Sequence, residues 1–426
     1  MDEFNLDDGE VHCEAIPLSQ IAKQVGTPVY VYSAATLRRH ARVMREALKG
    51  LPDPLIAYAV KANPNPAVLS ILAQEGMGAD IVSIGEYRAA RKAGMETKTI
   101  LFSGVGKTAE EMCEALAGGL LQFNLESVEE ARTLSAVASG MGREAPVALR
   151  INPDVEAGTH AKIATGKGDN KFGIPARHAI DAYRTVRDLP GIRVAGITVH
   201  IGSQLTSLAP LEAAFICLGS IIVALRDQGI GLELADLGGG LGVPYGPGQP
   251  KPPAPQEYGA MVKRVTTDWS LRLAFEPGRL ISGNAGVLVA RVIRLKLGQA
   301  HPWVIVDAAM NDLMRPALYD AFHHIEALQP NGRQMTAHVA GPVCETGDTF
   351  AMSREMDEVQ EGDLLIFRTA GAYGATMSNG YNSRPMVPEV MVDGQHWALV
   401  RRRFDLAEAT HVAKLDWQDG LAGRND

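Results

Sequence analysis

Two charged residues stand at the ends of apolar runs, where they could take part in chemistry. Lys61 directly follows the run 55–60, and Glu276 ends the run 271–276. A lysine in such a place is partly desolvated, which lowers its pKa and makes the neutral amine available as a nucleophile. Lys61 is therefore a candidate for Schiff-base chemistry. The alternative is a lysine whose stem packs on the protein while its ammonium group reaches water.

Two glycine-containing turns could bind a phosphate group. Gly238, Gly239 and Gly240 follow another apolar run, and Gly278 precedes Arg279. Such glycines let the backbone approach a ligand closely and leave N–H groups available to phosphate oxygens. We interpret the two turns as a phosphate cradle. The alternative is a pair of ordinary tight turns, since glycine is also the default turn residue.

Glu276 and His200 could contact a flat cofactor ring. A carboxylate at the end of an apolar strand needs a partner, and a protonated ring nitrogen would be a suitable one. A structural salt bridge is the competing explanation. His200 ends the run 194–200 and could stack on a ring or serve as a hydrogen-bonded histidine at the rim of the fold.

The elements that must position these residues alternate between strand and helix patterns. Stretches with helical periodicity, such as 66–74, 84–92 and 211–227, lie between consecutive apolar runs, and a further helix is predicted at 34–48. The eight predicted strands are 55–60, 79–82, 99–102, 121–124, 147–151, 194–200, 232–237 and 271–276. This repetition over about 250 residues predicts a (β/α)8 TIM-type barrel, in which active sites lie at the carboxyl ends of the strands.

The main alternative is a doubly wound open sheet with a dinucleotide site. Gly104, Gly106 and Ala109 match a relaxed G-x-G-x-x-A turn, with Glu126 at a plausible distance. This turn follows the third predicted strand rather than the first. It also fails as a Walker A loop, because the position five before Gly106 is Leu101. The barrel is therefore favoured.

The last third of the sequence has long β-rich runs and predicts a second, mainly antiparallel β-domain. These runs are 287–297, 303–307, 364–369, 387–392 and 396–403. The strand-like segment 28–32 precedes the first barrel helix, so the amino-terminal end is expected to join this domain. We predict a barrel at 33–280 and a β-domain formed by 1–32 with 281–426. The proline-rich segment 246–255 is interpreted as a stiff surface loop.

Composition and charge exclude several classes of protein. The 41 Lys and Arg against 49 Asp and Glu give a formal net charge of -8 without basic tracts, which argues against a nucleic-acid partner. The longest mostly apolar stretch, 213–225, is too short to cross a bilayer of about 30 Å as a helix, and an acidic amino terminus does not predict export. Cys13, Cys113, Cys217 and Cys344 lie far apart, so we predict neither disulfides nor a metal site, and a cytoplasmic location.

The combination resembles the pyridoxal-phosphate enzymes that have an alanine racemase-like barrel and the β-domain of the basic amino-acid decarboxylases. Within that group it resembles the diaminopimelate decarboxylases. The resemblance covers nearly the whole chain. It is carried by seven motifs in the family's order, at 58–63, 200–204, 238–242, 276–279, 315–319, 341–348 and 371–374.

This resemblance implies that Lys61 binds pyridoxal 5'-phosphate covalently, that His200 stacks on its ring and that Glu276 keeps the ring nitrogen protonated. A racemase of this fold usually has an arginine in place of Glu276, whereas a charged ring nitrogen deepens the electron sink needed after loss of CO2. Decarboxylation is therefore favoured over racemisation. The residues expected to hold the phosphate are Ser203, Gly239, Gly240, Gly278, Arg279 and Tyr373.

The resemblance also implies a substrate with charges of both signs at its distal end. Arg279 and Arg315 would bind carboxylate, and Glu345 would bind the distal ammonium group. The segments 158–166 and 170–174 are similar to the diaminopimelate branch, while ornithine decarboxylases usually carry aspartate directly after the cysteine. Two further residues expected to face the substrate are Tyr319 and Tyr373.

In this family the cysteine corresponding to Cys344 is the acid that protonates the former α-carbon, and it reaches the site from the other subunit. The resemblance therefore implies that the β-domain contributes to the active site and that the protein is a homodimer with shared active sites. As a bare sequence feature, Cys344 could equally be a small buried thiol.

The predicted reaction is the decarboxylation of meso-2,6-diaminopimelate to L-lysine and CO2, the last step of lysine biosynthesis. One alternative is a sister decarboxylase that acts on ornithine, lysine or carboxynorspermidine. The other is a non-catalytic paralogue that only binds the cofactor. Such paralogues typically lose the acid or the substrate residues, and here Lys61, Arg279, Cys344 and Glu345 are all present.

Overall fold

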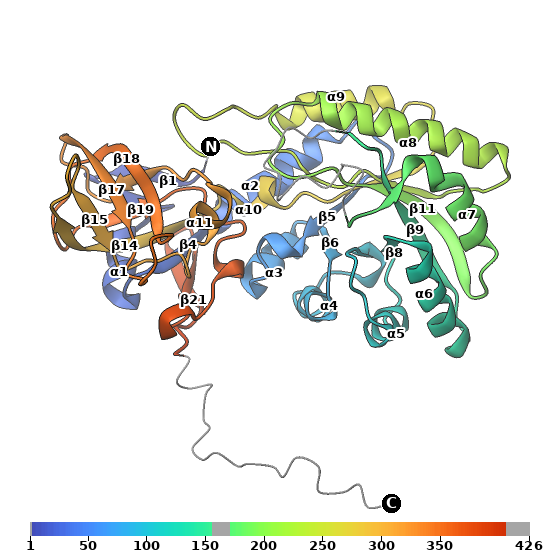
Figure 1. The fold of residues 1–426 in the computed structure, drawn as a ribbon, viewed down its shortest axis with the longest axis horizontal. Helices are drawn as coiled ribbons and strands as arrows, with labels where there is room; N and C mark the ends of the chain where they lie inside the picture. Colours follow the sequence, from blue (N-terminus) through green and yellow to red (C-terminus); the bar gives the residue numbers. More distant parts are fainter. Residues whose placement is uncertain (1, 156–170, 406–426) are drawn as a thin grey trace, which may run out of the picture.

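A closed barrel of eight parallel strands forms one half of the computed structural model, which describes residues 2–155 and 171–405 (Figure 1). The last strand pairs with the first, and the fourth pairs with the fifth, which closes the sheet. The strands are β5 (Leu55–Ala59), β6 (Gly78–Ile81), β7 (Ile100–Phe102), β8 (Gln122–Leu125), β9 (Ala145–Asn152), β11 (Ile192–Val199), β12 (Leu234–Asp236) and β13 (Arg272–Phe275). A two-residue strand, β10 (Ile174–Pro175), pairs with the end of β9. All eight predicted barrel strands are confirmed.

Helices surround the barrel, and local sequence explains where several of them begin. Side chains of Ser83, Thr108 and Ser127 accept hydrogen bonds from the amides of the first turns of the helices that follow them. Thr108 forms a capping box with Glu111. The helices are α2 (Ala34–Ala47), α3 (Pro66–Gln74), α4 (Ile84–Lys92), α5 (Ala109–Ala117), α6 (Val128–Gly140), α7 (Ala179–Arg187), α8 (Ala209–Asp227), α9 (Pro255–Val265) and α10 (Arg279–Ser282).

Helix α8 is, within the described residues, long and apolar enough to cross a membrane by length and composition. It contains the stretch 213–225, and the prediction that this stretch is too short to cross a bilayer does not hold for the whole helix, which spans Ala209–Asp227. In Figure 1 it lies in the outer ring of the barrel between α7 and α9. Its side chains Leu211, Phe215, Leu218 and Ile222 are buried, as expected for a helix that packs on a sheet.

A nine-stranded, mainly antiparallel sheet forms the other half of the structure. The amino-terminal strand β4 (Val29–Ser33) lies at its centre, paired with two strands from the carboxyl-terminal part of the chain. The other members are β14 (Gly286–Lys296), β15 (Trp303–Val306), β16 (Ile325–Ala327), β17 (Gln334–Ala340), β18 (Thr349–Asp357), β19 (Leu364–Phe367), β20 (Glu389–Asp393) and β21 (His396–Arg401). The exact domain boundaries, 33–280 and 1–32 with 281–426, stay a prediction.

Short elements that the sequence did not reveal complete the fold. A small antiparallel sheet precedes the first helix, and another short helix follows β15. These elements are β1 (Phe4–Asp7), β2 (Glu10–Cys13), β3 (Ile16–Pro17), α1 (Leu18–Val25) and α11 (Arg315–Tyr319). The segment 246–255 has no helix or strand before Pro255, as expected for a loop.

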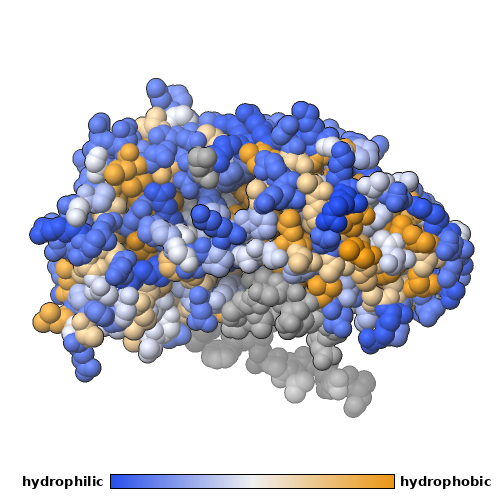
Figure 2. All heavy atoms as spheres, turned by 90° about the horizontal axis from the view of Figure 1, so that it is seen from above, coloured by the Kyte–Doolittle hydropathy of each residue, from blue (hydrophilic) through white to orange (hydrophobic). Residues whose placement is uncertain are grey.

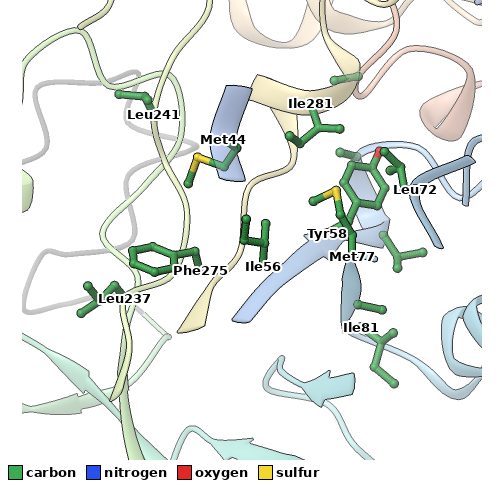
Figure 3. Packing of buried hydrophobic residues seen from close by; sticks show 14 of the residues in the cluster. Met44, Ile56, Tyr58, Leu72, Met77, Ile81, Leu237, Leu241, Phe275 and Ile281 are labelled. Carbon is green, nitrogen blue, oxygen red and sulfur yellow. The ribbon is translucent and has the colours of Figure 1, made fainter. Parts of the chain in front are cut away.

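The barrel strands alternate between two cores. Leu55 and Ala57 of β5 belong to a small cluster together with residues of β7, β12 and β13. Ile56 and Tyr58 belong instead to the large cluster that includes Met44 of α2 (Figure 3). This period of two is expected for strands with a filled interior and a helix layer outside. The surface differs from these continuous cores. On the face drawn in Figure 2, apolar residues form separate patches among hydrophilic ones.

Helices α2 and α9 approach closely because position 259 is glycine. A Cβ atom on Gly259 would lie 2.0 Å from the carbonyl oxygen of Ala47. We expect Gly259→Ala to lower the free energy of unfolding by about 1–3 kcal/mol, since the two helices must move apart. Urea denaturation would measure this change.

The matched control is Gly140→Ala at the end of α6, where an added Cβ has no neighbour within 4 Å. That substitution should be neutral or stabilising by up to about 1 kcal/mol. Equal effects of the two substitutions would contradict the close-packing explanation.

Candidate active site

A pocket at the carboxyl ends of the barrel strands brings together most of the residues predicted from the sequence. Lys61 lies in a single turn directly after β5, and Glu276 follows β13. Because parallel strands end at the same edge of a barrel, residues far apart in the sequence meet here. The predicted residues that line the pocket are Lys61, His200, Ser203, Gly239, Gly240, Glu276, Gly278, Arg279 and Tyr373.

Lys61 forms an ion pair with Asp80, which follows it at the end of the next strand. The Nζ atom lies 2.5 Å from Oδ2 of Asp80, and the Asp80 side chain is fully buried. Burial lowers the pKa of Lys61, but the carboxylates of Asp80 and Glu276 outweigh burial, so the pKa of Lys61 is raised. The prediction of a lowered lysine pKa was therefore wrong, because it left these two carboxylates out.

Glu276 lies in a buried polar network beside a second carboxyl group, Asp236. The Nδ2 atom of Asn124 donates to Oδ2 of Asp236 at 2.8 Å and to Oε1 of Glu276 at 3.4 Å. Burial, followed by the charges of Asp236 and Asp80, raises the pKa of Glu276 well above its usual value. The pKa of Asp236 is raised as well, so the two carboxyl groups titrate as a pair that favours holding one proton between them.

This acidic end of the pocket fits the ring end of pyridoxal phosphate. The Oδ1 atom of Asp80 is buried and has no hydrogen-bond partner among the described residues. A proton held by the Asp236–Glu276 pair could pass to a pyridine nitrogen, after which Glu276 and the ring would carry opposite charges. The residues present thus fit a ligand with a basic ring nitrogen.

His200 is a neutral, partly buried ring directly after β11. The amide of Gly239 donates to its Nδ1 atom at 3.1 Å, which leaves the ring proton on Nε2. Burial, and then the nearby charges of Arg150 and Lys61, lower the pKa of His200 well below its usual value. A neutral flat ring fixed by a backbone amide is suited to stacking on another ring.

The glycine turn after β12 is as tight as the predicted cradle requires. A Cβ on Gly239 would lie 2.3 Å from the carbonyl oxygen of Glu276, and Gly240 has a φ of 116°. No larger side chain fits at the first position, and few residues other than glycine adopt the second conformation. Beside this turn, a Cβ on Gly278 would lie 3.3 Å from the Tyr373 hydroxyl, which therefore reaches the same region.

Two buried arginines form the opposite, cationic end of the site. Arg279 donates to the hydroxyls of Ser203 and Tyr245. Arg315 in α11 lies with its guanidinium carbon 5.4 Å from the centre of the Tyr245 ring and 5.8 Å from that of Tyr319. Among the described residues neither arginine has an ion pair. Two buried cations without a protein anion are suited to binding a carboxylate or phosphate.

Four predicted residues are absent from the lining of this pocket in the described part of the chain: Arg315 and Tyr319 of α11, and Cys344 and Glu345. Cys344 and Glu345 are exposed, in the turn between β17 and β18, and are absent from the pocket lining in the described part of the chain. The amide of Cys344 donates to Asn382, and Tyr381 donates to Glu345. The alternative of a buried Cys344 thiol is wrong. All four cysteines are free.

Several residues of the site carry no motif signal of their own. Tyr245 and His323 were not predicted, and Asp236 was given no role although it lies in the predicted strand 232–237. The general rule that polar residues at the carboxyl ends of barrel strands face the site could have identified Asp80 and Asp236. The predicted segment 158–166 lies outside the described residues.

The fold and the pocket together define a barrel enzyme of the pyridoxal-dependent class. The family model "Pyridoxal-dependent decarboxylase, pyridoxal binding domain" matches residues 34–283. The chain is 52% identical to a diaminopimelate decarboxylase of Zymomonas mobilis over 97% of this chain and 99% of that protein. It is 49% identical to the diaminopimelate decarboxylase of Vibrio cholerae, over 96% and 97% respectively.

Solved structures agree with these matches. The diaminopimelate decarboxylase of M. jannaschii superposes with a TM-score of 0.92 at 34% identity and covers 96% of this chain and 98% of that one. The enzyme from Helicobacter pylori, solved in complex with L-lysine, gives a TM-score of 0.88 at 36% identity, over 92% and 98%. The chain belongs to the diaminopimelate decarboxylase family.

His323 gives the protein a specific pH dependence of stability. Its Nδ1 atom lies 2.9 Å from the carbonyl oxygen of Arg368 and therefore carries the proton. Burial, followed by the charge of Arg315, lowers the pKa of His323 to about 3. Below pH 6.5 the unfolded chain binds a proton at this histidine and the folded chain does not, so stability is lost as the pH falls.

Between pH 7 and pH 5 this single histidine should therefore remove about 2 kcal/mol from the free energy of unfolding. His323→Asn keeps a donor for the Arg368 carbonyl and should show a correspondingly smaller loss. Urea denaturation of the apoprotein at both pH values would measure the difference. His396→Asn, which changes an exposed histidine of β21, is the control. Parallel pH curves for the parent and His323→Asn would contradict the assignment.

Proposed function

We propose that this protein is a carboxy-lyase that uses pyridoxal 5'-phosphate to convert meso-2,6-diaminopimelate to L-lysine and CO2, the last step of lysine biosynthesis. The observation that carries this proposal is identity of about half of all residues to diaminopimelate decarboxylases over nearly the full chain, with 52% to one and 49% to another. The charge distribution of the pocket agrees with the chemistry of this substrate and cofactor.

The cofactor supplies, when bound, an electron sink for the carbanion left by loss of CO2. Lys61 provides the amine for covalent attachment, but its ammonium must first lose a proton. Asp80, 2.5 Å away, lies where it can hold that proton. Glu276 would hold a proton at the ring nitrogen, and His200 would cover the ring. The residues proposed to hold the phosphate are Ser203, Gly239, Gly240, Gly278, Arg279 and Tyr373.

Arg279 and Arg315 are proposed to bind the carboxylate at the distal end of the substrate. Both are almost completely buried, with 4% and 5% exposure, so a carboxylate bound there is shielded from water. In such surroundings charge-assisted hydrogen bonds to carboxylate are strong. Two more proposed substrate contacts are Tyr319 and Tyr373.

The remaining two roles are proposed to come from a second subunit. Glu345 would bind the distal ammonium group, and Cys344 would donate the proton to the former α-carbon. Their exposure and their absence from the chain's own pocket lining, among the described residues, agree with a homodimer in which each subunit completes the other's site. A cytoplasmic location is proposed for this biosynthetic enzyme.

Purified protein loaded with pyridoxal phosphate is expected to release CO2 from meso-diaminopimelate with L-lysine as the product, and to be inactive on L-ornithine and L-lysine. Measurement of CO2 and identification of the amine test this directly. Lys61→Ala should abolish the reaction, since no other lysine lines the described pocket. Release of CO2 from ornithine or lysine alone would move the protein to a sister decarboxylase. No release from any substrate would favour the non-catalytic paralogue.

Mixing two inactive variants tests the shared active site. Lys61→Ala and Cys344→Ala damage groups that the proposal places on different subunits of one site. After dissociation and reassociation, the mixture should recover about a quarter of the parental activity, because half of randomly paired dimers are hybrids with one intact site of two. Mixing Lys61→Ala with Glu276→Ala, which lie in the same pocket, is the control and should recover none. Equal recovery in both mixtures, or none in either, would contradict the shared site.

A further inference from the structure

Tyr245 lies between the two arginines of the cationic end. It follows the glycine-rich turn, is 7% exposed, and its hydroxyl is hydrogen-bonded to Nη1 of Arg279. Its ring centre is 5.8 Å from the guanidinium carbon of Arg279 and 5.4 Å from that of Arg315. Among the described aromatic residues, Tyr245 is the one whose ring lies beside the guanidinium groups of both Arg279 and Arg315.

Tyr245 offsets an unfavourable arrangement of charge. Two buried guanidinium groups near each other repel, and the described residues provide no carboxylate for either of them. The face of an aromatic ring attracts a cation, and the attraction is larger where water is excluded. The ring thus stabilises both cations in the absence of an anion, while the hydroxyl fixes the direction of Arg279.

The surroundings hold the Tyr245 ring in one orientation. The imidazole of His323 packs edge-on against it, with ring centres 5.2 Å apart and an angle of 88° between the planes. The amide of His324 donates to the Tyr245 carbonyl at 3.3 Å. A Cβ on Gly246 would lie 2.9 Å from His324, so the two loops pack tightly. The position of Tyr245 is therefore set by the fold before a substrate binds.

We propose that Tyr245 is a positioning residue that holds Arg279 and Arg315 as a preformed pair for the carboxylate at the substrate's distal end. Its ligand class is an amino acid with a carboxylate remote from the reacting carbon. This inference rests on the proposed function, since it takes the two arginines as the groups that bind that carboxylate. Tyr245 itself selects for the carboxylate through the arginines and takes no part in the loss of CO2.

Two diamines of the same length separate this role from a general structural one. L-Lysine keeps the distal carboxylate of meso-diaminopimelate, whereas 1,5-diaminopentane has lost both carboxylates. Binding of each to the holoenzyme is measured through the change in cofactor absorbance. Tyr245→Phe should weaken L-lysine binding about tenfold, the effect of one charge-assisted hydrogen bond, and leave 1,5-diaminopentane binding unchanged. Tyr245→Leu, which also removes the ring, should weaken L-lysine binding further.

Steady-state kinetics provide a second measurement on the same variant. For meso-diaminopimelate, Tyr245→Phe should raise KM about tenfold and change kcat by less than about threefold, because the ground state and the transition state lose the same contact. The matched control is Tyr183→Phe. The Tyr183 hydroxyl is also buried and donates to the carbonyl oxygen of Gly196 at 2.7 Å, in the barrel wall. Its loss should lower stability and leave L-lysine binding and KM unchanged.

The possible outcomes are distinct. Unchanged L-lysine binding by Tyr245→Phe would overturn the inference. An equal weakening of L-lysine and 1,5-diaminopentane binding would also overturn it, because an equal effect indicates a disturbed cofactor rather than a lost carboxylate site. If the parent enzyme itself bound both diamines equally, the proposed substrate assignment would fall, and this inference with it.

Discussion

The balance of charge at the carboxyl end of the barrel constrains the rest of the active site. Asp80, Asp236 and Glu276 are buried within one pocket region, where three carboxylates cannot all be ionised without cations. Lys61 neutralises Asp80, and a proton shared between Asp236 and Glu276 removes a second negative charge. A buried amide, Asn124, bridges the last two groups. The raised pKa of Lys61 therefore favours its ammonium form, and the raised pKa of the Asp236–Glu276 pair favours one proton that a basic ligand could accept.

The other end of the site has an excess of positive charge. Arg279 and Arg315 are buried with neutral partners, the hydroxyl of Ser203 and the ring and hydroxyl of Tyr245. A ligand with a basic ring at one end and anionic groups at the other satisfies both ends at once. Under the proposed function, cofactor and substrate provide these charges together. Under the proposed function, this separation of charge across the site favours one orientation of the bound ligand.

The sequence predicted the barrel well because each of its strands is buried on both faces and reads as a short apolar run. It missed β17 and β18, whose Met, Ala, Glu and Arg residues favour helices, because their strand state depends on pairing with each other. Helix α9 was missed because Gly259 interrupts its pattern. The error on the pKa of Lys61 has the same origin, since Asp80 is a neighbour in space and not in the motif. Tyr245 gave no signal because its role depends on two arginines distant in the sequence.

The turn that carries Cys344 and Glu345 is ordered although these two side chains are exposed. Both carboxylate oxygens of the buried Asp348 accept backbone hydrogen bonds across this turn, from Met310 at 2.6 Å and from Val343 at 2.7 Å. Fixing the backbone of such a turn costs conformational entropy. Side chains that stay exposed to solvent make few contacts that could offset this cost. A fixed turn is useful if it holds the thiol of Cys344 and the carboxylate of Glu345 in a defined geometry for another molecule. Under the proposed function, that other molecule is a second copy of the chain with its bound substrate.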